Sequence, residues 1–197
     1  MTNLVSSIKI REPCSYDNWT RRIIHQQNKA DYHVEGLSIN DKVVNYFPRG
    51  LCDYFPRMTR LEIRSCELMQ VSREDFAGLE NLEHLSLCYN HLKSLPDDLF
   101  SDTRKLTWID FSYNMIQHAS SKLFDPIEAD LVWVDFRKNA EIDDYFKKNK
   151  NNTINSLLNK IDMHCTFPTV QDNQLETRIK ELEDALRNQG NSCIENT

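Results

Sequence analysis

The sequence predicts a right-handed α/β solenoid, bent into an arc, whose short parallel strands form one concave sheet, with a short helix near the C-terminus. Two observations predict this fold class. Apolar residues recur every 24 residues through the middle of the 197-residue chain. Within each period they first alternate with polar residues, as in a half-buried strand. Because one such unit cannot bury its apolar side alone, neighbouring units must stack on one another.

The best-formed unit spans residues 82–100 and has the sequence LEHLSLCYNHLKSLPDDLF. Leu85 and Leu87 alternate with polar residues, which suits a strand with one buried face. Asn90 follows, and its side chain can bond backbone groups where the chain leaves the strand. Shifting this pattern by 24 residues, and by 25 residues for the last unit, gives five repeats. They start at residues 34, 58, 82, 106 and 131.

Each end of a solenoid exposes a core face that another segment must cover. Residues 1–33 are polar with scattered apolar residues, and we interpret them as an N-terminal cap in which Ile8 and Ile10 suit a short strand. The repeats occupy residues 34–148. Apolar residues within 149–165 recur at the spacing of one helix face, which predicts a helical C-terminal cap. These residues are Ile154, Leu157, Leu158 and Ile161.

A second helical pattern follows the predicted cap. Residues 166–173 contain Pro168 and polar residues, which is typical of a linker. Residues 174–189 carry a short coiled-coil pattern, and residues 190–197 form a tail. Because a helix of this length is marginal alone in water, it must pack on a partner helix, another copy of itself or the solenoid, and we favour a partner helix. The predicted association residues are Leu175, Ile179, Leu182 and Leu186.

Composition excludes several functional classes. The formal net charge is −6 and no Lys/Arg cluster is present, which disfavours nucleic-acid binding. No apolar run is long enough to span a membrane. The N-terminal residues lack the apolar region of a signal peptide. The four glycines form no phosphate-binding loop, and no C-x-x-C motif indicates zinc, so we expect no cofactor and no metal site.

The concave face is the predicted binding surface. Stacking places equivalent residues of adjacent strands about 4.8 Å apart, so that side chains form columns, and Trp108 and Trp133 become neighbours. Exposed Trp and Tyr together with Arg are typical of binding hot spots. The alternative is an ordinary solvated sheet face. The candidate protein-binding residues are Arg60, Glu62, Arg64, His84, Ser86, Tyr89, Trp108, Asp110, Tyr113, Trp133, Asp135 and Arg137.

Catalysis is the main competing class, and the geometry disfavours it. His84, Cys88 and Asp110 have the right types for a base, a nucleophile and an orienting acid. However, His84 and Cys88 lie four residues apart on one strand. They are therefore separated by about 13 Å, whereas proton transfer needs about 3 Å. Asp110 and Asp135 are adjacent carboxylates that could share a proton, but an open concave sheet implies no pocket around them. We therefore predict no catalytic residues.

The repeat positions also predict the states of the cysteines. Cys66 occupies the position of Asn90, and Cys52 occupies the position of a core phenylalanine, so both are expected to be buried. Cys88 lies on the strand face that points away from the core. Cys193 follows the coiled-coil pattern and either links two chains or is a free tail thiol.

The repeats resemble extracellular-type leucine-rich repeats, with Leu95-Pro96 and Phe100 at the positions which that class uses. The layout, with a coiled coil after the repeats, resembles short insect extracellular and immune leucine-rich-repeat proteins. This resemblance implies recognition of another protein or a pathogen surface on the concave face, secretion, and association through the helix as a homodimer or heterodimer. In a secreted chain, Asn18 and Asn151 would be glycosylation acceptors.

Two cysteine positions depart from the pattern that the resemblance implies. Relatives pair a cap cysteine with a second one just before the first repeat, whereas Cys14 is followed by no cysteine before Val34. In the C-terminal cap only Cys165 remains, and it lies too far from Cys14 to bond within a solenoid. These departures, with no signal peptide in this chain, leave an intracellular leucine-rich-repeat adaptor as the alternative.

Overall fold

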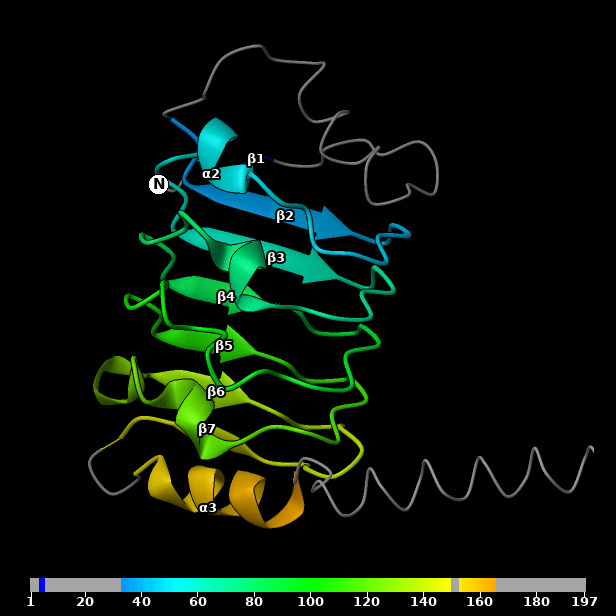
Figure 1. The fold of residues 1–197 in the computed structure, drawn as a ribbon, viewed down its shortest axis with the longest axis vertical. Coiled ribbons are helices and arrows are strands. Elements are labelled where there is room, and N and C mark those ends of the chain that lie inside the picture. The colour runs from blue at the N-terminus through cyan, green and yellow to red at the C-terminus, as the bar shows by residue number, and fades with distance from the viewer. Residues whose placement is uncertain (1–3, 6–32, 150–152, 166–197) are drawn as a thin grey trace, which may run out of the picture. The chain divides into compact units, whose positions relative to one another are not determined.

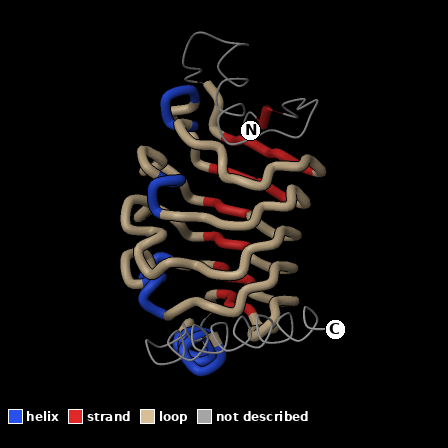
Figure 2. The backbone as a smooth tube through the Cα atoms, turned by 45° about the vertical axis from the view of Figure 1, so that its right-hand side comes forward, coloured by secondary structure: helices blue, strands red, loops and turns tan. Residues whose placement is uncertain are grey.

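The computed structural model describes residues 4–5, 33–149 and 153–165. All of them lie in one unit, Met1–Thr166, and the second unit is Phe167–Thr197. The described part is a stack of coils, with the strands on one side and the helical turns on the other (Figures 1 and 2). The predicted strand at Ile8–Ile10, the association helix, Cys14, Cys193 and both glycosylation acceptors lie outside the described residues.

One sheet of seven strands runs through the stack in the order of the chain. The strands are β1 (Leu4–Val5), β2 (Gly36–Asn40), β3 (Arg60–Arg64), β4 (His84–Ser86), β5 (Trp108–Asp110), β6 (Trp133–Asp135) and β7 (Tyr145–Lys147). The pairs from β1 to β6 are parallel. Equivalent repeat residues face each other, as in the series Gly36, Arg60, His84, Trp108 and Trp133. The predicted parallel sheet and solenoid fold are confirmed.

The last strand differs from the others, because β7 runs antiparallel to β6. No strand was predicted at Tyr145–Lys147. The side chain of Phe146 is 5% exposed, while Tyr145 and Lys147 are exposed, which is the alternation of a half-buried strand. Since this strand follows a short return and not a full coil, it enters the sheet from the opposite direction and adds an edge.

Aromatic side chains fill the space between the sheet and the convex side. Phe76, Phe100 and Phe124 recur at one repeat position, are fully buried, and pack with ring centroids 6.2–6.3 Å apart. Two of them end 3₁₀ turns, and the short helical elements are α2 (Leu51–Tyr54), η1 (Arg73–Phe76), η2 (Ser121–Phe124) and η3 (Glu128–Asp130). The prediction for Cys52 is wrong, since it is only partly buried. Leu51, one residue earlier in α2, is 2% exposed and lies in the core, as Leu99 and Leu123 do at the same position of later repeats.

A ladder of asparagines satisfies backbone groups where β4, β5 and β6 end. The Oδ1 atom of Asn90 accepts hydrogen bonds from the amides of Cys66 (3.0 Å) and Leu68 (3.1 Å) in the preceding repeat. Its Nδ2 donates to the carbonyls of Ile63 (2.7 Å) and Leu87 (2.9 Å). Asn114 and Asn139 repeat this pattern one and two coils later. The ladder therefore joins successive repeats through buried hydrogen bonds.

Cys66 takes the asparagine position in the second repeat and is fully buried, as predicted. Its thiol donates to the carbonyls of Arg64 (3.0 Å) and Ile39 (3.4 Å), so it replaces part of the asparagine's bonding.

A helix closes the C-terminal end of the core. Helix α3 (Asn155–His164) presents Leu157 and Ile161, 2% and 0% exposed, to the last coil. Ile154 is also buried, while Leu158 is partly buried against the same cluster. Asp162 binds the amide of Ser121 at the start of η2 (2.7 Å), which ties the helix to the convex side.

Candidate functional site

The strand register brings the aromatic residues of the concave face into one column. The indole rings of Trp108 and Trp133 stack with centroids 6.5 Å apart and an interplanar angle of 10°. The ring of His84 lies 6.1 Å from Trp108 on one side. Tyr145 from β7 extends the column on the other side, 5.2 Å from Trp133. We name these four residues the aromatic column.

Arg137 holds the C-terminal end of the aromatic column. Its guanidinium carbon lies 4.7 Å from the centroid of Tyr145 and 5.9 Å from that of Trp133, which is the range of cation–π contacts. The Asp135 carboxylate accepts from its Nε at 3.0 and 3.1 Å and from its Nη2 at 2.6 Å. Asp135 raises the pKa of Arg137, mainly through these hydrogen bonds and also through its negative charge. Arg137 is therefore fixed in place over the two rings.

Two of the predicted binding residues, Asp135 and Ser86, are buried. Both were expected on the accessible face, but only 4% of Asp135 and 3% of Ser86 are exposed. Each is used inside the protein, because Asp135 binds Arg137 and Ser86 donates to the sulfur of Cys88 (3.4 Å). These side chains support the face and offer little surface to a ligand.

The two neighbouring carboxylates of the face are used separately. Asp110 Oδ1 accepts from the amide of Ser112 (2.9 Å) and from its hydroxyl (2.6 Å). Asp135 Oδ1 accepts from the amide of Arg137 (2.9 Å), also two residues later. Each carboxylate thus closes a local turn at the end of its own strand.

Cys88 lies among polar groups of the concave side but is buried, with 1% exposed. The Nε of Arg64 donates to its sulfur at 3.1 Å, and Ser86 donates from the same strand. Burial raises the pKa of the Cys88 thiol. Because the thiolate is the reactive form, this environment disfavours a nucleophilic role.

Tyr89 and Tyr113 form a second aromatic feature, at the exits of β4 and β5. Their rings stack with centroids 4.2 Å apart and an interplanar angle of 9°. Both side chains are about half exposed, and both residues have positive φ, 58° and 55°. The equivalent residues of the other repeats, Asp41, Ser65 and Lys138, share this conformation. A bulky residue is uncommon in this conformation, and here the two rings stack on each other and leave about half of each side chain exposed.

A shallow depression lies beside the N-terminal end of the aromatic column. Its volume is about 250 Å³, and its lining comes from three successive strands: Arg60, Leu61, Glu62, His84, Ser86 and Trp108. Arg60 Nη1 lies 3.6 Å from the Glu62 carboxylate, while Ser38 donates to that carboxylate at 3.2 Å. Burial, and then the positive charge of Arg60, lower the pKa of His84.

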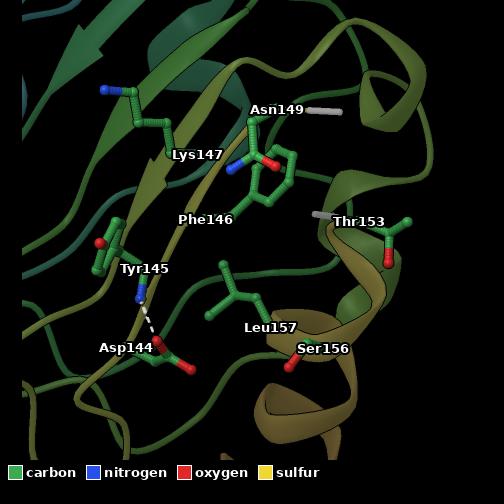
Figure 3. A pocket seen from close by; sticks show the side chains of 8 residues that line it. All are labelled: Asp144, Tyr145, Phe146, Lys147, Asn149, Thr153, Ser156 and Leu157. Carbon is green, nitrogen blue, oxygen red and sulfur yellow. Dashed lines mark hydrogen bonds between the residues drawn. The ribbon is translucent and has the colours of Figure 1, made fainter. Parts of the chain in front are cut away.

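A second pocket of about 320 Å³ opens between β7 and α3 (Figure 3). Phe146 and Leu157 lie at its centre, and Asp144 lies at one end. Asp144 accepts from the amide of Tyr145 (2.8 Å) and from Lys160 of α3. These bonds connect the edge strand to the capping helix, so the pocket belongs to the cap and is distinct from the aromatic column.

Among the residues that the structure describes, no group of three His, Cys, Asp or Glu side chains is placed to hold a metal ion. None of the helices described is both long and apolar enough to cross a membrane.

Comparison with known proteins identifies the repeats. The family model "Leucine rich repeat" matches residues 56–116 and 81–129. The fold is a leucine-rich-repeat solenoid, and residues 56–129 match that family. A curated relative, the transforming growth factor beta activator LRRC33 of Danio rerio, is 26% identical over 126 residues, which are 51% of this chain and 18% of that protein.

Solved structures share the same fold. In the glycosylated Toll–Spatzle complex of Drosophila, the matching chain is 23% identical, with a TM-score of 0.52 over 56% of this chain and 15% of that one. The TLR13–ssRNA13 complex gives 23% identity and a TM-score of 0.50 over 55% and 15%. The chain therefore spans less than a fifth of each of these leucine-rich-repeat proteins.

The structure brings most of the predicted face residues together. Trp108 and Trp133 stack as neighbours, and Arg60 and Glu62 flank His84 at the depression. Tyr89 and Tyr113 form a separate pair at the strand exits. Sequence reasoning missed Tyr145, although its alternation with Phe146 and Lys147 is the signal of a short strand.

Proposed function

We propose that this chain is a non-enzymatic protein-recognition module that binds its partner on the concave face of its leucine-rich repeats. The observation that carries the proposal is the aromatic column, in which Trp108 stacks on Trp133, Trp133 contacts Tyr145, and Arg137 lies over the rings of Trp133 and Tyr145. Tryptophan, tyrosine and arginine dominate binding hot spots. Because these side chains are already ordered by one another, binding costs less conformational entropy than it would on mobile side chains.

Site-specific crosslinking tests this proposal. A photoreactive amino acid is placed at Trp108 on the concave face, and at the exposed Glu80 on a loop outside the sheet as a matched control. We expect a discrete protein adduct from position 108 in extract of the native source, and none from position 80. Unlabelled wild-type protein should compete for the adduct, whereas a Trp133→Ala/Arg137→Ala variant should not. Adducts of equal strength from position 80, or competition by the variant, would contradict the proposal.

We further propose a setting in extracellular or innate-immune recognition, which rests on the resemblance to short insect leucine-rich-repeat proteins. An intracellular adaptor is the second candidate, favoured by the free thiols of four described cysteines, Cys52, Cys66, Cys88 and Cys165. A thiol count and glycan analysis of the native protein separate the two settings. A glycan at Asn18 and a disulfide at Cys193 support the extracellular setting, whereas six free thiols without a glycan support the adaptor.

We also propose that the predicted helix at residues 174–189 mediates association with a second helix. Its apolar residues have the spacing of a two-heptad coiled coil, which needs a partner surface to be stable. The molar mass of the full chain is compared with that of an Ile179→Asp/Leu182→Asp variant by light scattering. Loss of self-association, or of a co-purified partner, is expected in the variant. Equal masses and equal partner content would contradict this role.

A further inference from the structure

We infer that the depression beside His84 is an anchor site for one acidic side chain of the protein partner, with Arg60 as the carboxylate-binding group. The inference rests on the proposed concave-face recognition and names the chemistry that one part of that face accepts. Arg60 and Glu62 come from β3, His84 and Ser86 from β4, and Trp108 from β5. A polar group that enters here meets a cation, an imidazole and an indole within one small volume.

The size of the depression fits one side chain. Its volume of about 250 Å³ lies below the range of about 300–1,000 Å³ that is typical of small-molecule sites. Protein interfaces commonly use such depressions to receive a single anchor residue. The depression also adjoins the aromatic column through Trp108, so an inserted side chain would lie next to the proposed hot spot.

The charges of the face favour an acid. Arg137 is occupied by Asp135 at 2.6–3.1 Å, and Arg64 donates its Nε to Cys88. Arg60 forms an ion pair with Glu62, but at 3.6 Å it is longer than a hydrogen bond, and 37% of the Arg60 side chain is exposed. A guanidinium has five N–H donors and binds carboxylates in a two-pronged geometry. Arg60 is thus the arginine of this face that is best placed to receive a partner's carboxylate.

The affinity of this site for a carboxylate should depend on pH because of His84. Burial lowers the pKa of His84 most, and the positive charge of Arg60 on β3 lowers it further. The negative charges of Glu83 and Glu62 act in the opposite direction, and Trp108 on β5 is uncharged. A bound carboxylate would offset the charge of Arg60 and raise the pKa of His84 relative to the free protein. The complex then takes up a proton that the free protein does not hold, so affinity increases as pH falls from 7.5 towards 6.0.

A titration of the full chain with small probes tests the anchor. N-acetylglutamate N-methylamide is added to ¹⁵N-labelled protein, with the glutamine and lysine analogues as matched controls, and the tryptophan indole signals are followed by NMR. We expect the glutamate probe to shift the signal of Trp108 more than that of Trp133, with affinity roughly two- to fivefold higher at pH 6.0 than at pH 7.5. Arg60→Ala should abolish the shift, whereas Arg60→Lys should retain part of it. His84→Gln should remove the pH dependence.

Several results would overturn the anchor: an equal shift with the glutamine analogue, tighter binding of the lysine analogue, or an unchanged titration in a folded Arg60→Ala protein. Failure of the glutamate probe to shift Trp108 would overturn it as well. The crosslinking from position 108 is read independently. An adduct there without a response to the probe overturns the anchor and leaves concave-face recognition intact, while loss of the adduct removes the recognition proposal itself.

Discussion

Replacing Asn90 with alanine removes one complete rung of the asparagine ladder. The side chain is 4% exposed, and its oxygen is the acceptor for the amides of Cys66 and Leu68 in the preceding repeat. Alanine cannot accept these bonds, and the site is too buried for both amides to reach bulk water. The carbonyl of Leu87 keeps a second donor, the amide of Asn114, so the two amides dominate the loss.

The expected loss follows from these two amides. A buried donor left without a partner costs about 1–3 kcal/mol, so Asn90→Ala should lower the free energy of unfolding by roughly 3 kcal/mol. For a chain of this size that corresponds to a fall in Tm of about 6–12 °C. Asn90→Cys removes the same acceptor from the two amides, but it should lose somewhat less, because a thiol at this position can still donate to backbone carbonyls, as that of Cys66 does.

Urea unfolding followed by far-UV circular dichroism measures these differences for the wild type and both variants. The order of stability should be wild type, then Asn90→Cys, then Asn90→Ala. A loss below about 1 kcal/mol for alanine would refute the reasoning, because it would mean that water satisfies the two amides at little cost. A cysteine variant less stable than the alanine variant would refute the role assigned to the thiol.

Three further predictions concern a glycine turn, a buried cysteine of the C-terminal cap and the Arg137–Asp135 pair. Gly78→Ala should destabilise the fold by about 1–2 kcal/mol in urea unfolding, because φ is +76° and the new Cβ would lie 2.6 Å from Cys52 Sγ and 2.9 Å from Cys52 Cβ. Adding Cys52→Ala should recover only part of this loss, because it removes the contact with the sulfur and leaves the contact with Cβ and the positive φ. Burial raises the pKa of Cys165 to about 11, so thiol labelling at pH 8, mapped by mass spectrometry, should modify it only after unfolding. Arg137→Leu should lower the urea midpoint, because it leaves the buried Asp135 carboxylate without its guanidinium partner. The double variant Arg137→Leu/Asp135→Asn should recover much of this loss. Equal midpoints for the wild type and Arg137→Leu would contradict the pairing.

The sheet register could be predicted from the sequence because its two determinants are local. Alternation fixes which side chains face the core, and the 24-residue period fixes which strands pair, so the neighbours Trp108 and Trp133 follow directly. Strand β7 could not be predicted with the same ease. Its signal is a single alternation around Phe146, and nothing in three residues specifies that they pair in the antiparallel direction.

The accessibility of the face could not be predicted from position alone. Ser86 and Cys88 lie on the predicted face, but they bond each other and Arg64 and are buried. Asp135 is buried in the same way through Arg137. Burial at such positions depends on where long neighbouring side chains lie, which repeat spacing does not determine. The binding role of the remaining residues stays a prediction.

The most direct test of concave-face recognition is the crosslinking yield from position 108 compared with position 80, in the presence of unlabelled competitor. The account predicts a partner adduct from position 108 that wild-type protein displaces and the Trp133→Ala/Arg137→Ala variant does not. An adduct formed only from position 80, or one displaced equally by both competitors, would contradict it.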